Sequence, residues 1–127
     1  MRLIGLIGLG GALGSILRYW LGGLAQSRLG SAGFPAGTLA VNVAGCLAIG
    51  LMSYLTDSRG AGSPETRAVL MVGLLGGFTT FSAFGNETLN LFRDGEHLLA
   101  GANVAANVML GLTAVWLGRV AAHALWG

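Results

Sequence analysis

Charged side chains are scarce in this sequence of 127 residues, and lysine is absent altogether. Only 9% of the residues are charged, whereas a soluble globular domain carries roughly 25%. Hydrophobic residues make up 54% of the chain and glycine accounts for 23 residues, a composition typical of membrane-spanning proteins. The seven basic residues are all arginines scattered singly along the chain, so no basic patch is present that would bind nucleic acid.

Residues that commonly carry catalysis or covalent cross-links are also few. Cys46, the single cysteine, lies in an apolar run, which excludes an internal disulfide and predicts a small buried thiol. His97 and His123 stand alone near the expected membrane edges, without a Ser-His-Asp set, a metal-ligand cluster or a phosphate-binding loop. The sequence therefore predicts a protein that is not an enzyme.

What the sequence does contain is four apolar segments, each near the ~20 residues that a helix needs to cross a bilayer. These segments cover approximately residues 3–25, 36–56, 67–92 and 98–119. We therefore expect an all-α membrane protein with four transmembrane helices, organised as a single transmembrane domain over residues 1–127. Because four short helices enclose little space, we expect a pore to require a second copy of the chain.

The arginines are distributed almost evenly between the two ends of such a bundle. Four spans place both chain termini on one side of the membrane. That side holds Arg2, Arg59, Arg67 and Arg119, and the opposite side holds Arg28 and Arg93, together with Arg18 if it reaches the interface. Because Lys/Arg asymmetry orients membrane proteins, so weak a bias is compatible with insertion in both orientations or in one.

Polar residues inside the expected spans are candidates for function, because burying them in lipid is costly. Asn42 lies early in the second span, where its amide serves either an ion path or an interhelical hydrogen bond. Asn103, Asn107 and Gly111 recur every four residues, so they share one face of the fourth span and line a polar path or pack against another helix. Arg18 either extends to the membrane interface or supplies positive potential at an aqueous mouth.

The third span contains the stretch GGFTTFSAFGNE over residues 76–87. Its Gly pair and adjacent Thr residues form helices poorly, which favours a break near Gly76–Thr80 over a continuous, kinked helix. A break would free backbone carbonyls, which lipid cannot satisfy but which a hard cation would accept as ligands.

Phe81 and Phe84, just after the expected break, fall on one face of the helix. Because the edge of an aromatic ring is positive, two Phe edges in a narrow path would favour an anion, although ordinary core packing explains each ring as well. Glu87 is the one acid between Glu65 and Asp94, and its role as vestibule acid, proton site or bystander stays open.

Three stretches, GGFTTFSAF (76–84), GTLAVNVAG (37–45) and GGALGSILRYW (10–20), resemble the signatures of the Fluc, or CrcB, fluoride channel family. The resemblance implies a fluoride-selective channel of the cell inner membrane that exports the ion and relieves its toxicity. It also implies dual insertion and an antiparallel homodimer with two pores. A structural sodium ion would lie at the centre of this dimer.

The resemblance also implies roles for individual residues. The sodium ion would be held by the backbone carbonyls of Gly76 and Thr79. The anion pore would be lined by Asn42, Phe81, Phe84, Thr38, Thr80 and Ser82, and the vestibule by Arg18 and Glu87. On the fourth span this sequence departs from the family, since Asn103, Asn107 and Gly111 stand where members often have Tyr, His or Ser. We expect Asn103 and Asn107 to keep a polar pore face.

Two other functions fit parts of the sequence. A small proton-coupled multidrug-type exporter also has four spans, but such exporters use an acid in the first span, which is missing here. A non-transporting membrane assembly subunit would use the glycine faces and asparagines for packing alone. Fluoride efflux from liposomes distinguishes these alternatives.

Overall fold

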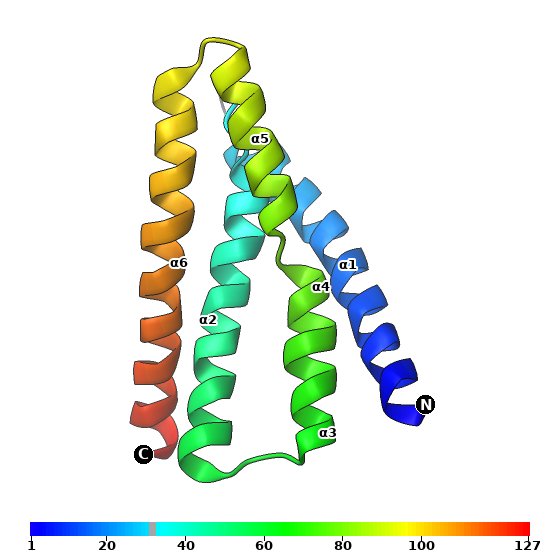
Figure 1. Ribbon diagram of the computed structural model, residues 1–127. Helices are drawn as coiled ribbons and strands as arrows, with labels where there is room; N and C mark the ends of the chain where they lie inside the picture. The colour runs from blue at the N-terminus through cyan, green and yellow to red at the C-terminus, as the bar shows by residue number, and fades with distance from the viewer. Residues whose placement is uncertain (31–32) are drawn as a thin grey trace.

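The computed structural model describes residues 1–30 and 33–127, and the regular secondary structure of these residues is entirely helical. Three long helices are α1 (Arg2–Leu29), α2 (Ala36–Arg59) and α6 (His97–Trp126). Between α2 and α6 the chain forms α3 (Pro64–Arg67), η1 (Ala68–Leu75), α4 (Gly76–Phe78) and α5 (Phe81–Arg93). Figure 1 shows α3, η1 and α4 stacked end to end, with α5 continuing above them at an offset.

Four stretches of the described chain are long and apolar enough to cross a membrane. They are Arg2–Leu29, Ala36–Arg59, Pro64–Arg93 and His97–Trp126. Both chain ends and the connection from α2 to α3 lie at one end of the bundle (Figure 1). The predicted all-helical, four-span architecture is therefore confirmed, and the chain is a multi-pass membrane protein.

Local sequence explains where the helices on either side of the 60–63 loop end and begin. Gly60 closes α2 in the left-handed conformation, at φ 62°, which a residue without a Cβ adopts at little cost. Ser63 then caps α3 by accepting a hydrogen bond from the Thr66 N–H, and Pro64 occupies the first turn, where its missing N–H is harmless.

Polar side chains at this end of the bundle join three helical segments. Asp57 pairs with Arg67 at 3.2 Å and with Arg119 at 3.7 Å, and the Tyr54 hydroxyl lies 2.7 Å from Nδ1 of His123. The ion-paired side chains are about half exposed, so each pair contributes little, roughly 0–1 kcal/mol.

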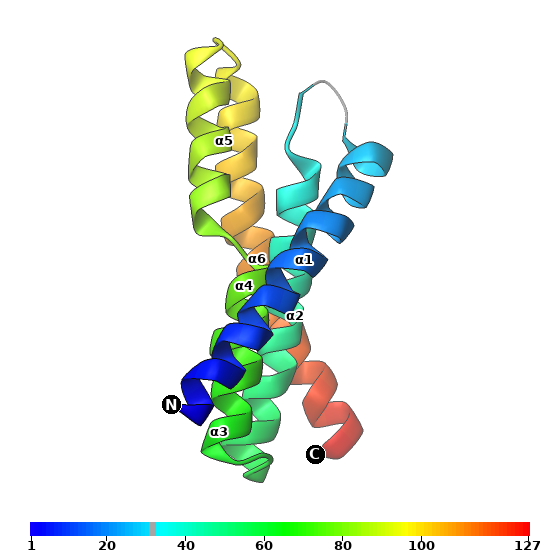
Figure 2. The same ribbon diagram turned by 90° about the vertical axis from the view of Figure 1, so that its right-hand side faces the viewer.

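The third span changes its packing partner along its length. Helix α2 lies in the middle of the bundle against α6, while η1 and α4 pack on α1 (Figures 1 and 2). Beyond α4 the chain leaves α1, and α5 packs on α6 instead. In Figure 2, α5 and α6 rise together on one side while α1 crosses in front of α4. The junction between α4 and α5 is therefore the point at which the third span passes from its contact with α1 to its contact with α6.

Glycines let the helix backbones approach each other closely. On α2 and α6, a Cβ added at Gly50 would overlap the Val115 carbonyl oxygen, and one added at Gly118 would overlap the Leu47 carbonyl oxygen. Large apolar side chains instead face outward, where lipid would cover them. The bundle is thus held by close backbone packing of small residues, as is common in membranes.

Replacing Gly118 by Ala should therefore destabilise the protein by about 1–3 kcal/mol, because the new methyl group is forced against the α2 backbone. The matched change Gly101→Ala lies on the same helix with no atom near the added Cβ, and should be neutral or stabilising by up to about 1 kcal/mol. Unfolding in a titration of denaturing detergent measures both. Equal effects of the two substitutions would contradict this account of the α2–α6 contact.

Candidate functional site

Two extended residues, Thr79 and Thr80, separate α4 from α5. Their backbone angles are φ −88°, ψ 156° and φ −151°, ψ 115°. Thr79 ends the lower segment, because its N–H and its hydroxyl each donate to the Leu75 carbonyl at 3.0 Å. Thr80 begins the upper segment, because its hydroxyl oxygen accepts a hydrogen bond from the Ala83 N–H at 3.2 Å. Each threonine thus caps the helix beside it.

The backbone of Thr80 is held by a side chain from another helix. Asn42 on α2 accepts a hydrogen bond from the Thr80 N–H at 2.9 Å and donates one to the Thr80 carbonyl at 3.2 Å. The carboxamide therefore pairs with both backbone groups, much as a neighbouring strand would. The sequence leaves Asn42 to serve either an ion path or an interhelical hydrogen bond, and the structure places it on the junction between α4 and α5.

A chain of amides continues from Asn42 into α6. Its Nδ2 donates a second hydrogen bond, at 3.1 Å, to Oδ1 of Asn107. Asn107 in turn donates from Nδ2 to the backbone carbonyl and to Oδ1 of Asn103, at 2.9 and 3.0 Å. Asn103 donates to the Thr88 hydroxyl at 2.9 Å, and this hydroxyl donates to the Phe84 carbonyl at 2.7 Å. The chain therefore links α2, α6 and α5.

The two asparagines of α6 differ in accessibility. They share one helix face, as their spacing predicts, but Asn103 is only 1% exposed and Asn107 is half-buried beside a cavity. Gly111, four residues further, is buried, and a Cβ there would contact Sγ of Cys46. On this face Asn107 lines the cavity, Asn103 is buried, and Gly111 packs against Cys46 of α2.

The junction leaves backbone carbonyls without helical partners. The Gly77 carbonyl accepts a hydrogen bond from Nε of Arg18 at 3.1 Å. Within residues 1–30 and 33–127, no N–H or O–H group donates to the carbonyl oxygens of Gly76 or Thr79. Two such oxygens suit a hard cation, which prefers oxygen ligands, so the donor set fits the expected metal. No cluster of His, Cys, Asp or Glu in the described chain offers an alternative metal site.

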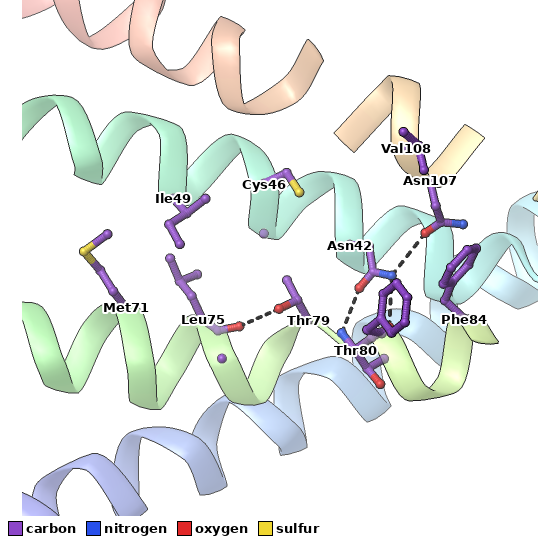
Figure 3. A pocket seen from close by; sticks show the side chains of 13 residues that line it. Asn42, Cys46, Ile49, Met71, Leu75, Thr79, Thr80, Phe84, Asn107 and Val108 are labelled. Carbon is purple, nitrogen blue, oxygen red and sulfur yellow. Dashed lines mark hydrogen bonds between the residues drawn. The ribbon is translucent and has the colours of Figure 1, made fainter. Parts of the chain in front are cut away.

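The two phenylalanines that follow the junction contact each other but lie in different surroundings. Their ring centroids are 5.3 Å apart and their planes are inclined by 58°. Phe84 is 9% exposed, whereas Phe81 is 83% exposed and points out of the single chain. Both line a cavity of about 360 Å³ together with Asn42, Thr80 and Asn107. Figure 3 shows Asn42 between Thr80 and Asn107, with Phe84 beside them.

A second cavity, of about 470 Å³, lies between α1, α2 and α5. Its lining includes Arg18, Thr38 and Glu87, and Thr80 lines both this cavity and the first. The Thr38 hydroxyl donates to Oε1 of Glu87 at 2.6 Å, while Oε2 has no hydrogen-bond partner in the described chain. Half-buried Arg18 is bonded to α4 through the Gly77 carbonyl, and its vestibule role stays a prediction.

The structure therefore brings most of the expected site residues around one junction. Ser82 joins them, because its hydroxyl lies 3.2 Å from that of Thr80. Asn103 stays inside the bundle, away from the lining of both cavities. Sequence reasoning missed the bonds from Thr38 to Glu87 and from Asn103 to Thr88. Only the polarity of these side chains within apolar runs could have indicated them.

The sequence around this site follows the pattern of a known family. A sequence profile for the family described as "CrcB-like protein, Camphor Resistance (CrcB)" matches residues 5–119, which is nearly the whole chain. The chain belongs to the CrcB family.

Several relatives are similar over almost their full length. A protein of Paramagnetospirillum magneticum named fluoride-specific ion channel FluC is 52% identical over 120 residues, which cover 92% of each chain. Proteins of the same name from Opitutus terrae and Rhizobium etli (strain CIAT 652) are 50% and 48% identical. Each of these alignments covers 94% of this chain, and they cover 91% and 95% of the relatives.

Replacing Asn42 by Ala should speed hydrogen exchange of the Thr80 amide about tenfold or more, because its acceptor is lost and leaving this part-buried donor unpaired costs roughly 1–3 kcal/mol. The matched change Asn86→Ala removes an exposed asparagine from α5 and should leave this exchange unchanged. Hydrogen–deuterium exchange in detergent measures both. Equal protection of Thr80 in wild type and Asn42→Ala would contradict the Asn42 contact.

Proposed function

We propose that this protein is a fluoride-selective channel that exports fluoride across the cytoplasmic (inner) membrane and thereby relieves its toxicity. The observation that carries the proposal is the junction at Thr79 and Thr80. The hydroxyl groups of Thr80 and Ser82 lie at this junction, and the rings of Phe81 and Phe84 follow it. It occurs in a chain that is 52% identical to a relative named fluoride-specific ion channel FluC.

The chemistry of the lining suits a small, strongly hydrated anion. Fluoride must exchange its water shell for other donors, and these must hold it weakly enough for release. Thr80 and Ser82 offer hydroxyl groups, and the edges of Phe81 and Phe84 carry partial positive charge. The Asn42 amide would join these donors once its hydrogen bond to Asn107 opens. Arg18 and Glu87 would act at the vestibule, where the arginine raises the local concentration of anions.

A second, antiparallel copy of the chain would complete two such pores. Phe81 supports this part of the proposal, because an aromatic ring that is 83% exposed beside a cavity leaves one wall of the path to another molecule. The weak arginine bias supports it as well, since an antiparallel pair requires insertion in both orientations. The third span would act as a broken transmembrane helix whose junction lies at the dimer centre.

Sodium would bind at this centre. The carbonyl oxygens of Gly76 and Thr79, which no donor in the described chain occupies, would hold the ion from each copy. A bound cation would satisfy these oxygens and tie the two copies together electrostatically. Arg18, bonded to the Gly77 carbonyl, would keep that third oxygen away from the ion.

A proton-coupled exporter is the second candidate, and one observation favours it. Glu87 lies within the third span and has a carboxylate oxygen without a hydrogen-bond partner in the described chain. Such a transporter would lose activity in the Glu87→Gln variant and would move protons with its substrate. A fluoride channel needs no proton coupling.

Purified protein in liposomes should release fluoride and retain chloride, because the donors described above compensate for fluoride dehydration without a fixed charge beside the Phe rings. Ion-selective electrodes record both anions after the membrane potential is collapsed with an ionophore. Empty liposomes provide the background. Well-folded protein that releases no fluoride would contradict the proposed function.

Replacing either Phe81 or Phe84 by Ile should reduce fluoride flux at least about tenfold, because an aliphatic side chain lacks the positive ring edge and a lost contact of about 1.4 kcal/mol is tenfold in rate. The matched control is Phe92→Ile, which removes a ring that is 58% exposed near the end of the same helix. Wild-type flux in both pore variants would remove these residues from the anion path.

A further inference from the structure

The direction of hydrogen bonding between Asn42 and Asn107 is imposed by backbone groups at both ends. The Thr80 N–H can only donate, so Oδ1 of Asn42 faces it, and Nδ2 is left to donate to the Thr80 carbonyl and to Asn107. The backbone carbonyl of Asn103 can only accept, so Nδ2 of Asn107 faces it and Oδ1 points toward Asn42. Neither amide can turn over without losing a bond to the backbone.

This arrangement leaves Asn42 with no donor for an anion. Its Nδ2 carries two hydrogens, of which one goes to the Thr80 carbonyl at 3.2 Å and the other to Oδ1 of Asn107 at 3.1 Å. Asn107 likewise spends both of its hydrogens on Asn103. The side-chain oxygen Oδ1 of Asn107 therefore lies where an anion bound to the Asn42 amide would have to lie.

Of the two acceptors that Asn42 serves, only the Asn107 side chain is able to move away. The Thr80 carbonyl is part of the backbone, and Asn42 is hydrogen-bonded to both the N–H and the carbonyl of this residue. Asn107 is half-buried and lines the cavity of about 360 Å³, so its side chain has space for rotation. Asn103 is 1% exposed and has no such space, so it stays in place and its two hydrogen bonds favour the return of Asn107.

We propose that the side-chain oxygen Oδ1 of Asn107 competes with the anion for the amide hydrogen of Asn42. Fluoride gains the Asn42 amide only when Asn107 rotates into the cavity, and the returning carbonyl displaces the ion afterwards. Asn107 thus weakens anion binding and favours release, which a conducting site requires. The inference rests on the proposed fluoride channel function and assigns a specific task to one residue of the fourth helix.

The Asn107→Ala variant removes the competing oxygen and frees one Asn42 hydrogen. The fluoride concentration that gives half-maximal flux should therefore fall about 2- to 10-fold, the range expected for one net hydrogen bond. The maximal flux should stay unchanged or fall, because release slows. The matched control Asn90→Ala alters an exposed asparagine of α5 and should change neither quantity. An unchanged or raised half-maximal concentration in Asn107→Ala would overturn the proposal.

A second measurement uses the wild-type protein and stands if the variant fails to fold. The side-chain NH₂ resonances of Asn42 and Asn107 are followed in detergent while sodium fluoride is added, with sodium chloride as the control salt. The proposal expects fluoride to shift both sets of resonances, because the bond between the two amides opens. Resonances of Asn107 that stay unchanged in a protein that carries fluoride flux would overturn it. Absence of wild-type flux would instead refute the proposed function.

Discussion

The contact between Asn42 and Thr80 is the interaction on which the arrangement of the third span depends. Helix α4 ends at Phe78 and α5 begins at Phe81, and a gap of this kind within a membrane would expose peptide groups that lipid cannot satisfy. Asn42 supplies both a donor and an acceptor to Thr80, so one side chain replaces the missing helical partners. Without it, the N–H and the carbonyl of Thr80 would lose these partners, at a cost of about 1–3 kcal/mol each.

The junction also allows one span to serve two packing surfaces. Below it, η1 and α4 follow α1 through glycine contacts, and above it α5 follows α6. A continuous helix would have one axis and could not change its neighbour so abruptly. The change opens the two cavities that share Thr80, with aromatic rings in one and Arg18 and Glu87 in the other.

Much of this architecture can be predicted from the sequence because the deciding signals are local. Apolar length marks the four spans. Gly76-Gly77 followed by Thr79-Thr80 predicts a break in the third span, and in the structure α4 ends at Phe78 and α5 begins at Phe81. The spacing of Asn103 and Asn107 likewise predicts their common face.

The remaining features depend on contacts between residues far apart in the chain. Asn42 meets a residue 38 positions away, and Arg18 meets a carbonyl 59 positions away, so no local pattern indicates either bond. The different exposure of Phe81 and Phe84 also depends on which helix α5 packs against, and the two look equivalent in the sequence. Helix periodicity predicts that both rings lie on one face of the helix, but it does not predict which of them is exposed.

The amide chain from Thr80 to Phe84 has a collective property that none of its bonds has alone. It starts at a backbone N–H and finishes at a backbone carbonyl, with every side chain between them donating in the same sense. Dipoles aligned in this way polarise one another, so each bond strengthens its neighbours in a medium of low dielectric constant. Loss of any one amide therefore weakens the other hydrogen bonds of the chain. The rigidity with which α5 is held against the bundle thus depends on side chains of α2, α6 and α5 together.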